Sequence, residues 1–185
     1  MGVDEAENKK DVRASVCIFA RNDMDMDIRI DISMDDIMSA VHERTAYVGS
    51  KMSGQMPGAY ERIATTYADE QFLARSIKEG CSVLYDVMYR YMPSAIAQDG
   101  KLSVYLLMPD SYNGGANAAV RDKLQQFFVS YAVGAWFSVT YKVDADAYKS
   151  AAASELAGIR VLLAERKHPT RVKPVEVRRE TTRYE

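Results

Sequence analysis

A stripe of apolar residues between Ala68 and Met92 constrains the fold of this chain more than any other feature of its sequence. The residues of the stripe recur at steps of three and four, and they are Leu73, Ile77, Cys81, Leu84, Met88 and Tyr91. This spacing places all of them on one face of an α-helix. Pro93 ends the helix, because the residue before a proline disfavours the helical conformation. The sequence therefore predicts a long helix over residues 68–92 with this face turned toward the core.

Three other segments show the same periodicity. The first begins at Ser33, whose side chain can cap a helix, and ends at Gly49, which suits a helix end. The second spans residues 116–141, and the third starts at a cap on Asp144 or Asp146. The apolar positions on their inner faces are Met34, Ile37, Met38, Val41 and Val48, then Val120, Leu124, Phe127, Phe128, Tyr131, Ala135 and Val139, and finally Tyr148, Ala152, Leu156, Ile159 and Leu163.

Three glycines, Gly80, Gly134 and Gly158, lie inside these predicted helices, where each costs about 1 kcal/mol relative to alanine. Either the missing side chain lets two helices approach closely, or packing elsewhere tolerates the residue. The four helices together cover roughly half of the chain, above the average of about a third in globular proteins. The residues expected to be buried where the long helices meet are Leu84, Phe128, Trp136 and Leu162.

Two segments have the character of strands. From Met24 to Ile32, apolar residues alternate strictly with charged residues, which indicates a half-buried strand. Residues 14–20 form a β-prone run just before it, separated by a turn sequence, so an N-terminal β-hairpin is predicted. Residues 101–108 predict one further strand. The expected fold class is α+β and mainly helical, with a four-helix core, an N-terminal β-hairpin and one further strand.

The length of 185 residues fits a single domain with an arm at each end. We expect a flexible N-terminal segment over residues 1–12, a single helical α+β domain over 13–168, and an extended basic C-terminal arm over 169–185. Residues 1–36 carry ten acidic and five basic side chains, a net charge of −5, whereas residues 166–185 carry seven basic and three acidic side chains, a net charge of +4. The two ends of the chain are therefore oppositely charged.

No catalytic or metal-binding pattern is recognisable in the sequence. Asp23, Asp25 and Asp27 resemble the start of a calcium loop, but its sixth and twelfth positions hold Ile28 and Met34 instead of glycine and glutamate. These three aspartates are better explained as the solvated face of the predicted strand. The two histidines have no partner at metal-ligand spacing. The longest apolar stretch spans 13 residues, whereas a membrane span needs about 20. We therefore predict no enzymatic activity, no metal, no cofactor and no membrane role.

The arm at residues 169–185 is the least globular part of the chain, because two prolines prevent a helix and its valines favour an extended path. It is either a frayed end, a segment that lies across a neighbouring subunit, or a basic segment that contacts a DNA backbone non-specifically. Tyr85, Tyr89 and Tyr91 are a second candidate for a subunit interface, with an ordinary amphipathic boundary as the alternative. The candidate subunit-contact residues of the arm are Arg171, Lys173, Val175, Val177, Arg178, Arg179 and Arg183.

The second half of the chain resembles a known protein family. A long apolar helix ending at residues 135–137 (AWF) is followed, after a short gap, by an alanine-rich helix that closes with residues 158–163 (GIRVLL). Together with the helix that begins at Asp69-Glu70, this pattern is similar to the head-to-tail connector (neck adaptor) proteins of tailed phages and prophages, including Bacteroides-type prophage proteins. The resemblance covers residues 60–169. The predicted N-terminal hairpin and the strand over 101–108 depart from the smallest members of that family.

The resemblance implies a structural virion protein, without enzymatic activity, that forms a homo-oligomeric ring between the portal and the tail. Its partners would be further copies of itself, the portal, and tail or other neck proteins. It would reside in the virion at the neck/tail junction after assembly in the host cytoplasm. A tail-completion protein or other phage assembly factor, and a cellular binding or regulatory module, are the alternatives. The family has no catalytic motif, so the resemblance assigns no functional residue.

Overall fold

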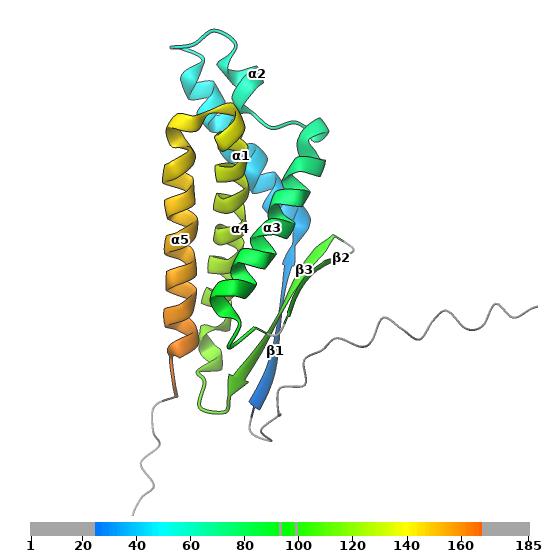
Figure 1. The fold of residues 1–185 in the computed structure, drawn as a ribbon, viewed down its shortest axis with the longest axis vertical. Coiled ribbons are helices and arrows are strands. Elements are labelled where there is room, and N and C mark those ends of the chain that lie inside the picture. The colour runs from blue at the N-terminus through cyan, green and yellow to red at the C-terminus, as the bar shows by residue number, and fades with distance from the viewer. Residues whose placement is uncertain (1–24, 93, 99, 168–185) are drawn as a thin grey trace, which may run out of the picture.

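The computed structural model describes residues 25–92, 94–98 and 100–167. Four long helices and a three-stranded antiparallel sheet make up this part of the chain, together with one short helix and two single turns of 3-10 helix (Figure 1). The expected mainly helical α+β class is confirmed. In chain order the helices and strands are β1 (Asp25–Ser33), α1 (Met34–Met52), α2 (Ala59–Ile63), α3 (Glu70–Met88), β2 (Ser94–Gln98), β3 (Lys101–Pro109), α4 (Asn117–Thr140) and α5 (Lys142–Ala164).

Strand β3 forms the centre of the sheet, with β1 on one side and β2 on the other. β1 pairs with β3 along its whole length, from Asp25 opposite Pro109 to Ser33 opposite Lys101. The β2 strand, which was not predicted, joins β3 through a tight turn at Gly100, whose φ of 72° is favourable for glycine. The expected hairpin partner of β1, the run before residue 24, lies outside the described residues.

The alternation predicted for β1 is confirmed. Ile30 and Ile32 are buried, whereas Asp27, Arg29 and Asp31 are exposed to solvent. β3 alternates in the same way, so one face of the sheet packs against the helices and the other faces solvent. The aspartates of β1 that the structure describes therefore belong to the solvated face of a strand, as the sequence indicated.

Three helix boundaries differ from the predictions. The helix expected to run to residue 92 ends at Met88, so Tyr91 of the predicted stripe lies in the turn that follows α3. The Ser33 cap is confirmed, since its side chain accepts a hydrogen bond from the backbone N–H of Asp36. Gly49 does not end α1, which continues to Met52. Its missing side chain instead lets α2 approach. A Cβ atom at this position would lie 3.2 Å from the Cα of Tyr60. Neither Asp144 nor Asp146 caps α5, which begins at Lys142 after a single linking residue.

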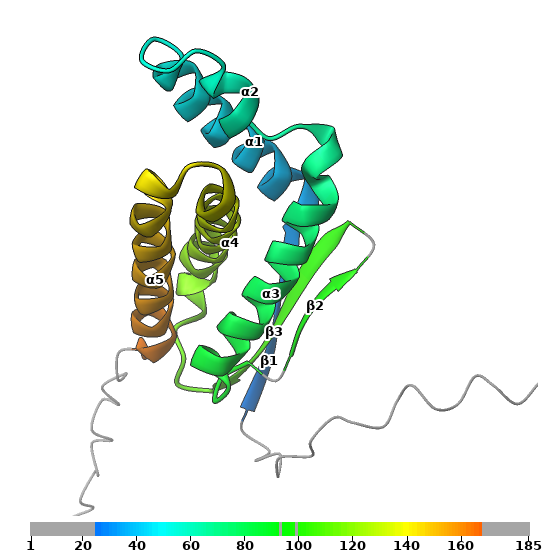
Figure 2. The same cartoon turned by 45° about the horizontal axis from the view of Figure 1, so that its top comes forward.

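The three helical glycines differ in what the missing side chain allows. A Cβ atom at Gly134 would lie 3.4 Å from the backbone nitrogen of Lys149, so this glycine lets α4 and α5 pack closely as an antiparallel pair (Figure 2). A Cβ atom at Gly80 would lie 3.3 Å from the ring of Phe128, so this glycine makes room for a side chain of α4. At Gly158 the neighbour is the flexible Lys123 side chain, at 2.9 Å, and not the backbone of another helix. Close approach of two helix backbones is therefore confirmed at Gly134 and not at Gly158.

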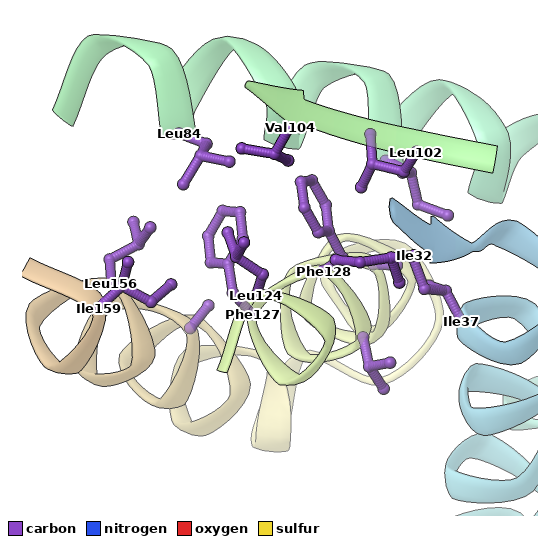
Figure 3. Packing of buried hydrophobic residues seen from close by; sticks show 14 of the residues in the cluster. Ile32, Ile37, Leu84, Leu102, Val104, Leu124, Phe127, Phe128, Leu156 and Ile159 are labelled. Carbon is purple, nitrogen blue, oxygen red and sulfur yellow. The ribbon is translucent and has the colours of Figure 1, made fainter. Parts of the chain in front are cut away.

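The core forms around α4, which contacts α1, α3, α5 and β1. The fully buried Phe127 and Phe128 extend from α4 toward α3 and the sheet, with their rings 4.9 Å apart in an edge-to-face arrangement (Figure 3). Leu84 of α3 and Val104 of β3 are also fully buried and belong to the same cluster. The expected burial of Leu84 and Phe128 is therefore confirmed.

Three expectations for the core are wrong. Trp136 and Leu162 are only half-buried, and Val139 is 70% exposed near the end of α4. Trp136 lies at the edge of the core because its indole N–H requires an acceptor. It donates to the carbonyl oxygen of Ile63 over 2.7 Å, and its ring lies edge-to-face on Phe72. Trp136 therefore joins α4 to α2 and α3 at the boundary of the core rather than filling its centre.

Candidate interaction surfaces

A pocket of about 610 Å³ lies between the first half of α1 and the segment that leads from α2 into α3. We call it the acidic pocket. It is lined by three carboxylates, two tyrosine rings and one imidazole, together with smaller side chains. The side chains that define its chemistry are those of Asp35, His42, Glu43, Tyr60, Tyr67 and Glu70.

A buried polar network holds the two walls of the acidic pocket together. The Thr45 hydroxyl, which is fully buried on α1, donates to the Val41 carbonyl oxygen and accepts from the backbone N–H of Thr65 over 3.1 Å. The hydroxyls of Thr45 and Thr65 also lie 2.8 Å apart. Backbone groups that lose water need such partners. The network therefore fixes the segment after α2 against α1.

His42 belongs to the same network. Its Nδ1 lies 2.8 Å from the hydroxyl oxygen of Thr65 and 3.2 Å from the carbonyl oxygen of that residue. The other ring nitrogen, Nε2, is buried and has no hydrogen-bond partner within the part of the chain that the structure describes. The ring of Tyr67 lies 6.0 Å away in a tilted arrangement. The imidazole of His42 thus helps to hold the segment after α2 against α1.

The charge of the acidic pocket is not neutralised by its neighbours. Within the part of the chain that the structure describes, no lysine or arginine lines it. Arg44, the nearest cation along α1, instead donates to the side chains of Ser130 and Gln126 on α4. Among the described residues, none of the ion pairs formed involves Asp35, Glu43 or Glu70. Three exposed carboxylates around one concavity attract cations.

A second concave surface lies between the C-terminal ends of α3 and α5, and we call it the α3–α5 groove. Its volume is also about 610 Å³, and it is lined by Val87, Tyr89, Arg90, Tyr91, Arg160 and Val161, with Met88 and Ala164. The side chains of Tyr89 and Val161 are 57% and 67% exposed. Exposed apolar and aromatic side chains around a concave surface are typical of protein interfaces. Tyr89 and Tyr91, two of the three tyrosines singled out in the sequence, therefore line a candidate interface, whereas Tyr85 is not among its lining residues.

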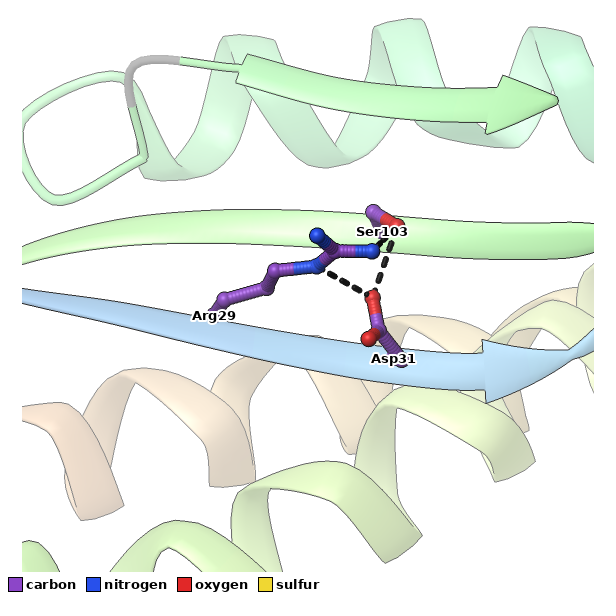
Figure 4. Close-up of polar contacts among 3 residues, drawn as sticks. All are labelled: Arg29, Asp31 and Ser103. Carbon is purple, nitrogen blue, oxygen red and sulfur yellow. Dashed lines mark hydrogen bonds and ion pairs between the residues drawn. The ribbon is translucent and has the colours of Figure 1, made fainter.

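The solvent-exposed face of the sheet carries a compact polar cluster (Figure 4). Arg29 donates from Nε to Asp31 over 2.8 Å, and the Ser103 hydroxyl donates to the same carboxylate oxygen over 2.7 Å. The hydrogen bond from Arg29 contributes most to holding the pKa of Asp31 below its ordinary value, and the hydrogen bond from Ser103 contributes next. Because the charges of Arg29 and Asp31 compensate each other, this face is a weaker candidate for binding a charged partner than the acidic pocket.

The residues that the sequence nominated as subunit contacts, from Arg171 to Arg183, lie outside the described residues. The structure does show where the arm begins. Lys167 donates from its backbone N–H to the Ser111 carbonyl oxygen over 2.7 Å and from Nζ to the Asp110 carbonyl oxygen over 2.8 Å. Lys167, the last described residue, therefore lies beside the loop between β3 and α4, at the same end of the molecule as the C-terminal ends of α3 and α5 (Figure 1).

The remaining chemistry of the described residues is sparse. No group of three or more His, Cys, Asp or Glu side chains within residues 25–92, 94–98 and 100–167 could hold a metal ion. Cys81 is half-buried, and burial raises the pKa of its thiol to about 11, so little of it is in the nucleophilic thiolate form near neutral pH. None of the helices in the described residues is long and apolar enough to cross a bilayer.

Comparisons of the chain with family models, with curated proteins and with solved structures found no match.

Proposed function

We propose that this chain is a structural virion protein of a tailed-phage neck, where its copies form a ring between the portal and the tail. The α3–α5 groove carries the proposal, because it presents exposed tyrosine and valine side chains on a concave surface, with Arg90 just after α3 and Arg160 on α5. Tyrosine and arginine are enriched where proteins bind proteins. The groove is built from helix ends, so a neighbouring subunit can reach it without rearrangement of the core.

A closed ring formed by head-to-tail contacts requires two different surfaces on each subunit. The acidic pocket includes Glu70, the first residue of α3, and the α3–α5 groove includes Met88, its last residue. A helix of 19 residues is about 28 Å long. The two surfaces therefore lie at opposite ends of the domain and differ in chemistry, one acidic and the other apolar with positive charge. This arrangement suits repeated contacts between identical copies.

The sequence resemblance adds support of a different kind. The three segments on which it rests form α3, α4 and α5. The α4–α5 pair is joined by one residue and packs closely at Gly134, with an ion pair of 2.9 Å between Lys123 and Glu155. A rigid helical pair is a suitable scaffold for a subunit that acts by packing rather than by catalysis.

The test is to locate the protein in particles of a phage, or of an induced prophage, that carries this sequence. We expect mass spectrometry to detect the chain in purified tailed virions, and electron microscopy to place it as a ring at the portal–tail junction. Particles that lack the chain, or that carry it only elsewhere, would contradict the proposal. Portal, capsid and tail genes beside its gene are expected as well.

A matched pair of variants tests the role of the groove. Val161→Asp places a charge in the α3–α5 groove, whereas Val143→Asp places one at the other end of the same helix, where the side chain is 78% exposed. Both substitutions replace an exposed valine on α5, so both proteins are expected to fold. We expect Val161→Asp to reduce incorporation into virions severalfold and Val143→Asp to leave it close to the wild-type level.

A further inference from the structure

We infer that the acidic pocket binds arginine side chains from residues 168–185 of a second copy of this chain. These residues are the basic arm, 169–185, and the His168 that precedes it. The inference rests on the proposed function, which supplies the second copy as the next subunit of a ring. It adds the receptor for the arm and the chemistry of the contact.

The pocket has the features expected of a guanidinium site. Asp35, Glu43 and Glu70 supply carboxylates that form charge-assisted hydrogen bonds with a guanidinium group. The rings of Tyr60 and Tyr67, 47% and 86% exposed, offer aromatic faces over which a cation can lie. Arginine suits both contacts better than lysine, because its planar group binds carboxylates in pairs and stacks on aromatic rings.

His42 helps to hold the wall of the pocket in place. Its Nδ1 lies 2.8 Å from the Thr65 hydroxyl oxygen and 3.2 Å from the Thr65 carbonyl oxygen. Its Nε2 atom is buried, so it does not face an incoming side chain. The contacts that we propose for the guanidinium group are therefore those with the three carboxylates and the two tyrosine rings.

The arm has the complementary composition. It contains Arg171, Lys173, Arg178, Arg179 and Arg183, and it begins beside the α3–α5 groove, at the end of α3 opposite the acidic pocket. Residues 168–185 span up to about 60 Å when extended, enough to cross to a neighbour.

The experiment is site-specific photo-crosslinking of the full-length chain. A photoreactive amino acid replaces Tyr67 at the mouth of the pocket, and in a control protein it replaces Tyr47, which is 66% exposed on α1. Each protein is mixed with an isotope-labelled copy, so that mass spectrometry separates crosslinks between copies from those within one copy. We expect position 67 to give crosslinks between copies that map to residues 168–185, and position 47 to give severalfold fewer.

Charge reversal tests the chemistry of the contact. We expect Glu43→Lys with Glu70→Lys to reduce the crosslink yield severalfold, and Asp122→Lys with Asp146→Lys, two exposed carboxylates outside the pocket, to leave it unchanged. Arg178→Glu with Arg179→Glu should reduce the yield as well, and mixing these arm variants with the pocket variants should restore it. Rescue by mixing shows that the variants are folded, because two unfolded proteins would not bind each other.

Three results would overturn the inference. They are the absence of crosslinks from position 67 to the arm, crosslinks within one copy only, and a yield that is insensitive to both charge reversals. The neck proposal is judged separately, by the presence of the chain at the portal–tail junction of virions. If the chain occupies the neck and the pocket variants are incorporated as well as the wild type, the proposed function stands. The acidic pocket is then refuted as the receptor of the arm.

Discussion

Replacing Thr45 with valine is expected to destabilise the protein by about 1–3 kcal/mol, although valine has nearly the same shape. The hydroxyl of Thr45 is fully buried and accepts from the backbone N–H of Thr65, itself only 8% exposed. Valine cannot accept this hydrogen bond, so a buried donor is left unpaired, at a cost of about 1–3 kcal/mol. At about 2–4 °C per kcal/mol, the midpoint of thermal unfolding should fall by roughly 2–12 °C.

Urea unfolding followed by circular dichroism measures this change, with Thr45→Ser as the matched control. Serine keeps the hydroxyl and loses one methyl group, so Thr45→Ser should cost about 1 kcal/mol or less. A valine variant as stable as the wild type, or more stable than the serine variant, would refute the hydrogen-bond network that we assign to the walls of the acidic pocket. Unchanged unfolding slopes are needed for the comparison, because a changed slope indicates a different denatured state.

Three further outcomes follow from individual residues. Phe128→Ala should cost about 3–5 kcal/mol in urea unfolding, because the ring is fully buried, whereas Val139→Ala, at an exposed position, should stay within about 0.5 kcal/mol of the wild type. The hydrogen bond from Arg29 lowers the pKa of Asp31 in the folded protein. The stabilising effect of this contact is therefore present above the ordinary pKa of 3.8, and it is lost as the pH falls through the lowered value. Unfolding of Asp31→Asn in urea over this acidic range should therefore depend less on pH. Alkylation of Cys81 at pH about 8, followed by peptide mapping, should be much slower in the native than in the unfolded protein.

Periodicity in the sequence was sufficient to predict the long helices and β1. The apolar stripe that includes Leu73 and Leu84 places the inner face of α3 correctly, because burial of one face of a helix is a local property of its sequence. The β2 strand was missed because residues 94–98 show no alternation of apolar and polar side chains, and its burial pattern is equally irregular. The pairing of β1 with β3 could not be read from the sequence, since the residues that meet there are 68 to 84 positions apart.

Trp136 shows why side-chain burial is harder to predict than helix position. The periodicity places it on α4 correctly, but a helix end has a smaller core to face than a helix centre. Its N–H group also needs an acceptor, which it finds in the Ile63 carbonyl oxygen of another element. The acidic pocket is hidden for a related reason. His42 and Glu43 are adjacent in the sequence, but Tyr67 and Glu70 join them only after α2 and the following turn fold against α1.

The acidic charge at the start of the chain is distributed differently from what a count along the sequence suggests. Residues 1–36 carry a net charge of −5, yet Asp31 is paired with Arg29 on the open face of the sheet. Asp35, by contrast, lies in the acidic pocket. Its companions there, Glu43 and Glu70, do not belong to residues 1–36. An isolated exposed ion pair contributes only about 0–1 kcal/mol, so the net charge of a segment is a poor guide to binding. Several unpaired carboxylates around one concavity act together, and this is why we assign the basic arm to the acidic pocket rather than to the N-terminal strand.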